Sequence, residues 1–137
     1  MHIPIVTGFY AGLLGLLLVF LTARVIMIRA QAKVALLDGG NKDLLVAIRR
    51  QGNFCELVPL CLILIAVAEM ASSSIYLIHV LGIVLVVSRL IHPAGIDYEK
   101  GDSWQRVMGA TGTLIVMLVA SVWDIYLYLI RVALVSV

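Results

Sequence analysis

Four long apolar runs constrain the fold of this sequence more than any other feature. They lie at about residues 4–28, 52–70, 75–92 and 106–130. A helix needs about 20 apolar residues to cross a hydrocarbon layer about 30 Å thick. Hydrophobic residues make up 63% of the chain and charged residues 13%, which leaves too little polar surface for a soluble domain of this length. We therefore predict an all-α, integral membrane four-helix bundle in which residues 1–137 form a single domain.

The connections between the four runs differ in length and polarity. The polar segment 29–51 contains Gly39 and Gly40, which tolerate positive φ and predict a turn, and the helix formers at 42–51 can extend the second span beyond the lipid. The segment ASSS at 71–74 predicts a tight turn. The third connection, 92–105, is expected to be a loop that begins at Pro93. The first run lacks a basic segment before it, so we interpret it as a retained span and not a signal peptide.

Positive charge concentrates in the first and third connections. The first holds Arg29, Lys33, Lys42, Arg49 and Arg50, the third holds Lys100 between Arg89 and Arg106, and the second holds none. Because loops rich in Lys and Arg stay on the cytoplasmic side, we predict that connections one and three are cytoplasmic and both termini outside, in a bacterial inner membrane. The net charge of +2 and the absence of a basic stripe argue against nucleic-acid binding.

Strong polar groups gather at the predicted cytoplasmic ends of all four spans. They are Arg24 and Arg29 on the first span, Arg49, Asn53 and Glu56 on the second, Arg89 and His92 on the third, and Arg106 on the fourth. On the second span the spacing i, i+4, i+7 places Arg49, Asn53 and Glu56 on one helical stripe. A carboxylate at the centre of a span costs about 2.5–3.5 kcal/mol, and less nearer the surface, so Glu56 needs a reason to be there.

Simpler explanations exist for each of these groups. An arginine near a span end often extends to the headgroups, Glu56 can be half of a structural ion pair, and His92 can be a satisfied histidine at a helix end. Cys55 and Cys61 are expected to be free, since six residues of helix separate them too far for a disulfide. We expect Glu69, at the other end of the second span, to be exposed at headgroup level. No Cys or His spacing indicates a metal site.

The pattern R-x-x-x-N-x-x-E-x-x-P, formed by Arg49, Asn53, Glu56 and Pro59, resembles the MAPEG family (membrane-associated proteins in eicosanoid and glutathione metabolism). The segment SRLIH at 88–92, Arg106 at the start of the fourth span and the four-span layout support the resemblance. It covers essentially the whole chain and is nearest to the small bacterial members. It implies a homotrimer with the site between subunits.

The resemblance also implies a cofactor, glutathione, and a role for each polar residue. Arg106 and Arg29 would be catalytic, with Arg106 and the start of its helix, capped by Asp102 or Ser103, stabilising the glutathione thiolate. The cofactor-binding residues would be Arg49, Gln51, Asn53, Glu56, Arg89 and His92. Arg49 and Arg89 suit carboxylate, and Glu56 suits ammonium. The implied function is a membrane-bound glutathione transferase or peroxidase acting on lipophilic electrophiles from the bilayer.

Two alternatives remain open at this point. A small proton-coupled efflux protein could use Glu56 as its exchanging carboxylate, although the surrounding arginines suit a binding role better. A catalytically inactive scaffold with the MAPEG fold is kept open by two departures from the family pattern. Leu57 and Ile96 stand where several members have tyrosine, and Tyr98 is near the second position but out of register.

Overall fold

The computed structural model describes residues 3–99 and 103–135, which form four α-helices. The helices are α1 (Ile5–Ala32), α2 (Lys42–Met70), α3 (Ile75–Ala94) and α4 (Trp104–Val135). All four are long and apolar enough to cross a membrane. The predicted all-α membrane bundle is therefore confirmed.

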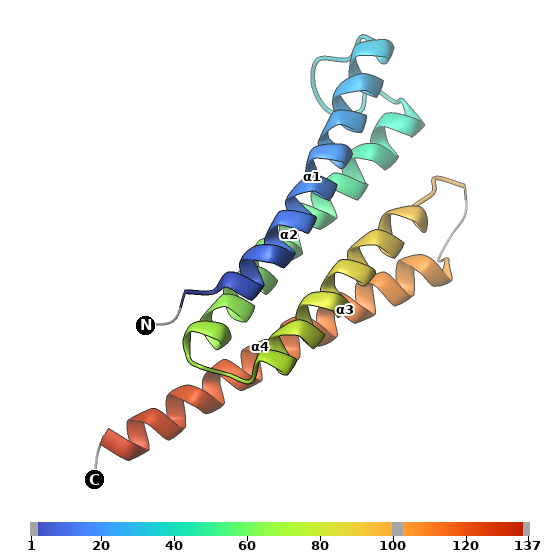
Figure 1. Ribbon diagram of the computed structural model, residues 1–137. Helices are drawn as coiled ribbons and strands as arrows, with labels where there is room; N and C mark the ends of the chain where they lie inside the picture. The colour runs from blue at the N-terminus through green and yellow to red at the C-terminus, as the bar shows by residue number, and fades with distance from the viewer. Residues whose placement is uncertain (1–2, 100–102, 136–137) are drawn as a thin grey trace.

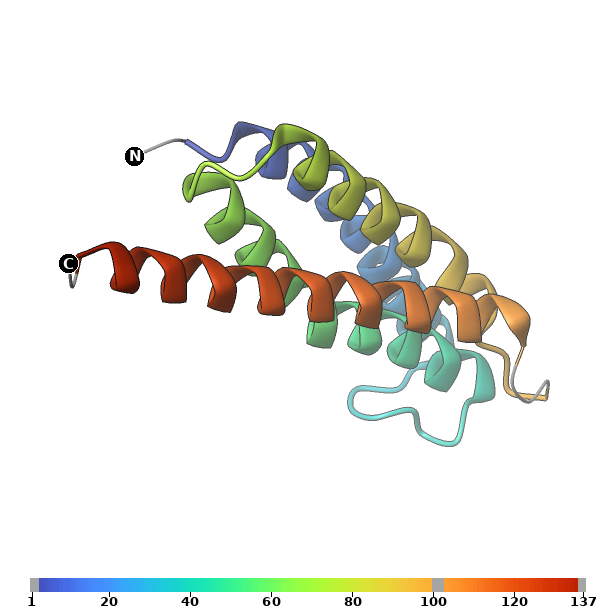
Figure 2. The same ribbon diagram turned by 90° about the horizontal axis from the view of Figure 1, so that it is seen from below.

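The helices pair as two antiparallel hairpins that lie side by side, α1 with α2 and α3 with α4 (Figure 1). Helix α2 also contacts α3 and α4, and α1 also contacts α3. Among the described residues, no Cα of α1 comes within 8 Å of a Cα of α4. The α2–α3 turn and both chain ends lie at one end of the bundle, and the two charged connections lie at the other (Figures 1 and 2). The two connections thus share an end, and the assignment of that end to the cytoplasm stays a prediction.

Each helix contributes one row of buried residues to the core. Leu14 of α1, Ile65 of α2, Leu85 of α3 and Val116 of α4 belong to one cluster and are almost fully buried. The outward faces are also apolar, as expected where lipid replaces water around the bundle.

Glycines allow the helices to approach closely. A side chain at Gly82 of α3 would collide with the ring of Tyr10 on α1, whose hydroxyl pairs with Nδ1 of His79 at 2.8 Å. A Cβ at Gly109 of α4 would lie 2.5 Å from Cβ of His92 on α3. The small residues therefore set the spacing of α3 against its neighbours, as is common in membrane bundles.

One helix boundary agrees with the expectation and another differs from it. Helix α2 begins at Lys42, where the Asn41 side chain accepts a hydrogen bond from the Leu44 N–H at 2.9 Å and caps the helix. The possible extension of the second span is thus realised, and the positive φ of Gly39 and Gly40 is confirmed in the preceding turn. Helix α3 continues through Pro93 to Ala94, because a proline in the last turn removes a single helical hydrogen bond.

The expectation for Glu69 was wrong. Its carboxylate accepts hydrogen bonds from the Val6 N–H at 2.9 Å, the Thr7 N–H at 2.7 Å and the Thr7 hydroxyl at 2.6 Å. The residue before α1 is Pro4, which supplies no capping side chain. The first N–H groups of α1 therefore lack helical partners and carry partial positive charge, and the anion at the end of α2 satisfies them.

Candidate functional site

A buried arginine connects three helices at the charged end of the bundle. Arg89 on α3 is 1% exposed, and its two terminal nitrogens donate to different helices. One bonds Oδ1 of Asn53 on α2 at 2.9 Å, and the other bonds the Gly109 carbonyl on α4 at 2.8 Å. The planar guanidinium suits this task because it offers several donors in fixed directions. Both terminal nitrogens thus bond protein acceptors within the same chain.

The bond to Arg89 fixes the orientation of the Asn53 amide. Because a guanidinium carries only donors, the amide oxygen must face it. The polar group that Asn53 keeps for another molecule is therefore its NH₂, a donor. Asn53 and Arg89 are two predicted site residues that the structure joins by a direct hydrogen bond.

Arg49, Asn53 and Glu56 form the predicted stripe on α2, called the α2 stripe below. Its two charged members, Arg49 and Glu56, face away from the core of the bundle. Arg49 and Glu56 are both exposed, and so are Cys55, Pro59 and further residues on that side of the helix. Among the described residues of the single chain, no other helix packs over this charged face at the end of the membrane span. The stripe is thus present as predicted, with Asn53 anchored inward and its two charged members pointing outward.

Three further predicted residues contact other parts of the same chain. Arg29 donates to the carbonyl of Leu37 at 3.0 Å and supports the loop after α1. Gln51 donates to the Thr22 hydroxyl at 3.0 Å and links α2 to α1. His92 is 4% exposed and packs at the α3–α4 contact. In these positions the side chains stabilise the fold of the single chain.

Arg106 has an exposed side chain on a fixed backbone. The Ser103 hydroxyl accepts a hydrogen bond from the Arg106 N–H at 3.3 Å and donates one to the Gly95 carbonyl at 2.8 Å. This confirms Ser103 as a cap of α4, while the other predicted cap, Asp102, lies outside the described residues. A Cβ at Gly95 would collide with the Arg106 nitrogen, so the end of α3 and the start of α4 are in contact.

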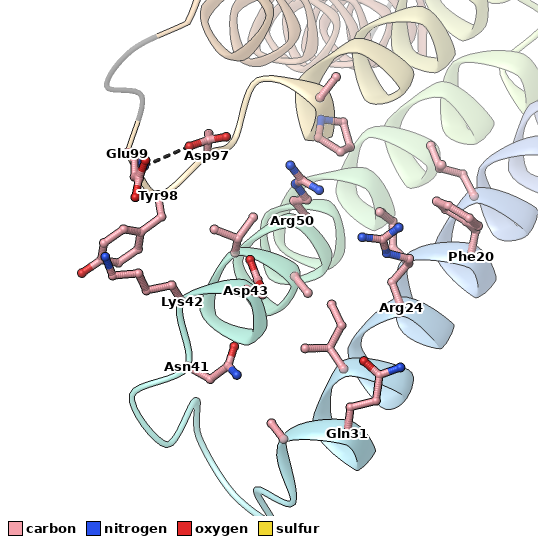
Figure 3. A pocket seen from close by; sticks show the side chains of 18 of the residues that line it. Phe20, Arg24, Gln31, Asn41, Lys42, Asp43, Arg50, Asp97, Tyr98 and Glu99 are labelled. Atoms are coloured by element: carbon pink, nitrogen blue, oxygen red, sulfur yellow. Dashed lines mark hydrogen bonds between the residues drawn. The ribbon is translucent and has the colours of Figure 1, made fainter.

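A cavity of about 1000 Å³ lies between the charged ends of α1, α2 and α3 (Figure 3). None of the eight predicted site residues lines it. Its basic residues include Arg24 and Arg50, and the second of these donates to the Ile96 carbonyl at 2.6 Å. In the sequence, Arg50 is one of the basic residues of the first connection. Arg50 lies four residues after Val46 and three after Ala47, which line the same cavity, and this helical spacing was the signal of an inward-facing side chain.

The described part of the chain contains no group of three His, Cys, Asp or Glu side chains that could hold a metal ion. Cys55 is exposed and Cys61 buried, and both are free thiols.

The comparisons with known proteins agree on one family. The sequence model of the MAPEG family matches residues 7–126. The chain is 37% identical over 120 residues to the inner membrane protein YecN of Escherichia coli K12, which covers 86% of this chain and 91% of that relative. The YecN of a second Escherichia coli strain, O6:H1, matches to the same extent. No solved structure matches.

Proposed function

This chain belongs to the MAPEG family, and on that premise we propose that it is an inner membrane transferase that activates the thiol of glutathione. Its substrates are lipophilic electrophiles that reach the site from the bilayer. The observation that carries the proposal is the α2 stripe, in which an anchored amide donor stands between an exposed cation and an exposed anion. Such an arrangement complements a zwitterionic peptide.

The length of the stripe supports a tripeptide ligand. Arg49 and Glu56 are seven residues apart, which corresponds to about 10 Å along a helix. Three residues of extended peptide span about 10 Å as well. Glutathione carries carboxylates and one ammonium group, so Arg49 binds a carboxylate and Glu56 binds the ammonium. Asn53 donates its NH₂ to a carbonyl between them.

Arg89 acts as a positioning residue in this proposal. Its guanidinium is buried and bonded to Asn53 and Gly109, so it holds the amide and does not clamp the ligand. The resemblance had suggested Arg89 as a second carboxylate ligand. The geometry favours the indirect role, because both terminal nitrogens already donate to protein oxygens.

The proposed chemistry is the attack of a thiolate on an electrophilic carbon. A free thiol with a pKa near 8.5 is mostly protonated at neutral pH. The guanidinium of Arg106, at the positive end of α4, stabilises the thiolate after its proton passes to water. The sulfur then forms a C–S bond, and the leaving group departs with the electron pair of the broken bond. The protein contributes position and positive charge, not a nucleophile of its own.

The exposed stripe supports a site between copies of this chain. Arg49 and Glu56 lie at the end of a membrane span without a cover from their own bundle. Ionised groups at membrane depth are costly unless another surface or an aqueous cavity takes them up. We place a second protomer against this face, in a homotrimer, with Arg29 of that neighbour near the ligand. The charged loops face the cytoplasm, where glutathione is supplied.

The test measures thiolate and binding separately. Detergent-solubilised protein is titrated with glutathione in a calorimeter, and the bound thiolate is followed by its ultraviolet absorbance. Arg106→Ala should lose the thiolate absorbance and conjugation of a chlorodinitrobenzene while still binding glutathione. Arg131→Ala, which removes an exposed arginine at the other end of α4, should behave like the wild type. Absence of glutathione binding to the wild type, or unchanged absorbance in Arg106→Ala, would reject the proposal.

A further inference from the structure

Three kinds of side chain line the cavity between α1, α2 and α3. From its inner end to its mouth they are apolar, then basic, then acidic. We propose that it binds the headgroup of a membrane phospholipid that contains a phosphate and an ammonium group, such as phosphatidylethanolamine. The phosphate lies against Arg24 and Arg50, the ammonium lies near the acids at the mouth, and the acyl chains follow the apolar face of α1. This site is distinct from the proposed thiol site, since none of its lining residues belongs to the α2 stripe.

Two arginines meet at one level in this cavity. Arg24 lies eight residues before the end of α1 at Ala32, and Arg50 lies eight residues after the start of α2 at Lys42. Because the two helices are antiparallel neighbours, both side chains arise about 12 Å below the helix ends and extend into the same space (Figure 3). The side chain of Arg24 donates no hydrogen bond to any described residue. Two guanidinium groups facing one cavity suit a phosphate.

The guanidinium of Arg50 is incompletely satisfied by the protein. One terminal nitrogen donates to the Ile96 carbonyl, while Nε is buried without an acceptor among the described residues. A buried donor of a charged group left unpaired is costly, and most such groups in proteins have a partner. An anion bound in the cavity would supply one.

The depth of the two arginines matches the level of lipid phosphates. Helix α1 has 28 residues and is about 42 Å long, against a hydrocarbon layer of about 30 Å. If its first residues lie at the far boundary, the helix extends about 12 Å beyond the near boundary. That is also the distance from the end of α1 to Arg24, which places the guanidinium where hydrocarbon gives way to phosphate.

Acidic side chains line the cavity above this level. Asp43 lies seven residues, or about 10 Å, outward from Arg50 along α2, and Glu99 lies in the loop after α3. Asp97, in the same loop, lies close enough to Arg50 to interact with its charge and accepts a hydrogen bond from the Glu99 N–H at 2.9 Å. The basic residue beside them, Lys42, places its ammonium 4.5 Å from the centre of the Tyr98 ring. A purely anionic headgroup would meet repulsion at this mouth, whereas a terminal ammonium is attracted.

The inner end of the cavity is apolar and reaches the surface that faces lipid. Leu17, Phe20 and Leu21 line it on α1, and Phe20 is 58% exposed. Neighbouring residues on α1, such as Leu16 at 71% and Val19 at 67%, are more exposed still. An acyl chain can therefore leave the cavity along α1 without crossing polar surface. The cavity volume of about 1000 Å³ is at the upper end of the range of small-molecule pockets and holds a headgroup comfortably.

The test is native mass spectrometry of delipidated protein titrated with defined lipids. Phosphatidylethanolamine should bind the wild type, and Arg24→Gln with Arg50→Gln should lower its affinity at least about tenfold, since each charge-assisted bond contributes that much. Arg131→Gln, the control at the opposite membrane face, should retain wild-type affinity. Equal lipid binding in the double variant and in this control would overturn the proposal. If the glutamine variant fails to fold, Arg24→Lys with Arg50→Lys replaces it and should give an intermediate loss.

Further measurements test which headgroup the cavity prefers. Asp43→Asn with Glu99→Gln should shift the preference from phosphatidylethanolamine toward phosphatidylglycerol by several fold, because it removes acids that attract the ammonium. An unchanged preference would overturn the role of the mouth. Free phosphoethanolamine or inorganic phosphate binding as tightly as the lipid would show a soluble-anion site instead. Displacement of the lipid by glutathione would assign the cavity to the thiol and overturn the lipid site.

Discussion

Replacing Arg89 with lysine tests the three-helix connection most directly. The guanidinium places one nitrogen at 2.9 Å from Asn53 Oδ1 and another at 2.8 Å from the Gly109 carbonyl. A single ammonium nitrogen cannot occupy both positions, so at least one charge-assisted bond is lost. Such a bond contributes about 1.5–3 kcal/mol. The Gly109 carbonyl would keep the Thr113 hydroxyl as a donor at 2.9 Å, whereas loss of the Asn53 bond would leave the amide oxygen unpaired and add about 1 kcal/mol. We expect Arg89→Lys to lower the free energy of unfolding by about 1.5–4 kcal/mol.

The measurement is denaturant unfolding of the detergent-solubilised protein, with helical content followed by circular dichroism. Arg131→Lys is the matched control, because Arg131 is exposed and bonds a single carbonyl, that of Ala71, at 3.1 Å. Arg131→Lys should change the free energy of unfolding by no more than about 0.5 kcal/mol. The change Asn53→Ala should cost less in the Arg89→Lys background than in the wild type, since the two residues share one bond. An Arg89→Lys protein as stable as the control, or fully additive effects, would refute the reasoning.

Two further predictions concern helix contacts at the other end of the bundle. Gly82→Ala should lower stability by about 1–3 kcal/mol, because its new methyl group would meet the ring of Tyr10. The control Gly12→Ala, where nothing lies within 4 Å, should be neutral or slightly stabilising in the same unfolding assay, and equal behaviour of the two variants would contradict the close contact. Glu69→Gln should lower stability by about 1–2 kcal/mol, since an amide NH₂ cannot accept a backbone N–H at the start of α1. The melting temperature in detergent measures this loss, and a melting temperature equal to that of the wild type would show that the carboxylate does not hold α1.

The α2 stripe shows what helical spacing in a sequence predicts and what it does not. Helical spacing correctly placed Arg49, Asn53 and Glu56 on one side of the second span, because a helix fixes which residues are neighbours. Spacing along one helix does not say which other helix a side chain meets. The Asn53–Arg89 bond joins residues 36 positions apart, and it decides that Asn53 presents a donor.

For Glu69, by contrast, the prediction from sequence position was wrong. Its place near the end of a span predicted an exposed headgroup-level residue, yet it caps α1 from 62 and 63 residues away. The partner could not be recognised locally, since it is a set of backbone N–H groups, which every sequence contains.

The apolar runs by themselves determined that this chain forms four membrane helices, because a bilayer leaves a long apolar segment few other ways to satisfy its backbone. Loop charge and turn residues determined which connections share an end. The packing of α3 against α2 and α4 alone decided that Arg89 is buried and bonded within the bundle. The facing ends of α1, α2 and α3 likewise decided that Arg24 and Arg50 share a cavity. Both outcomes depend on distances between helices, which local sequence patterns do not encode.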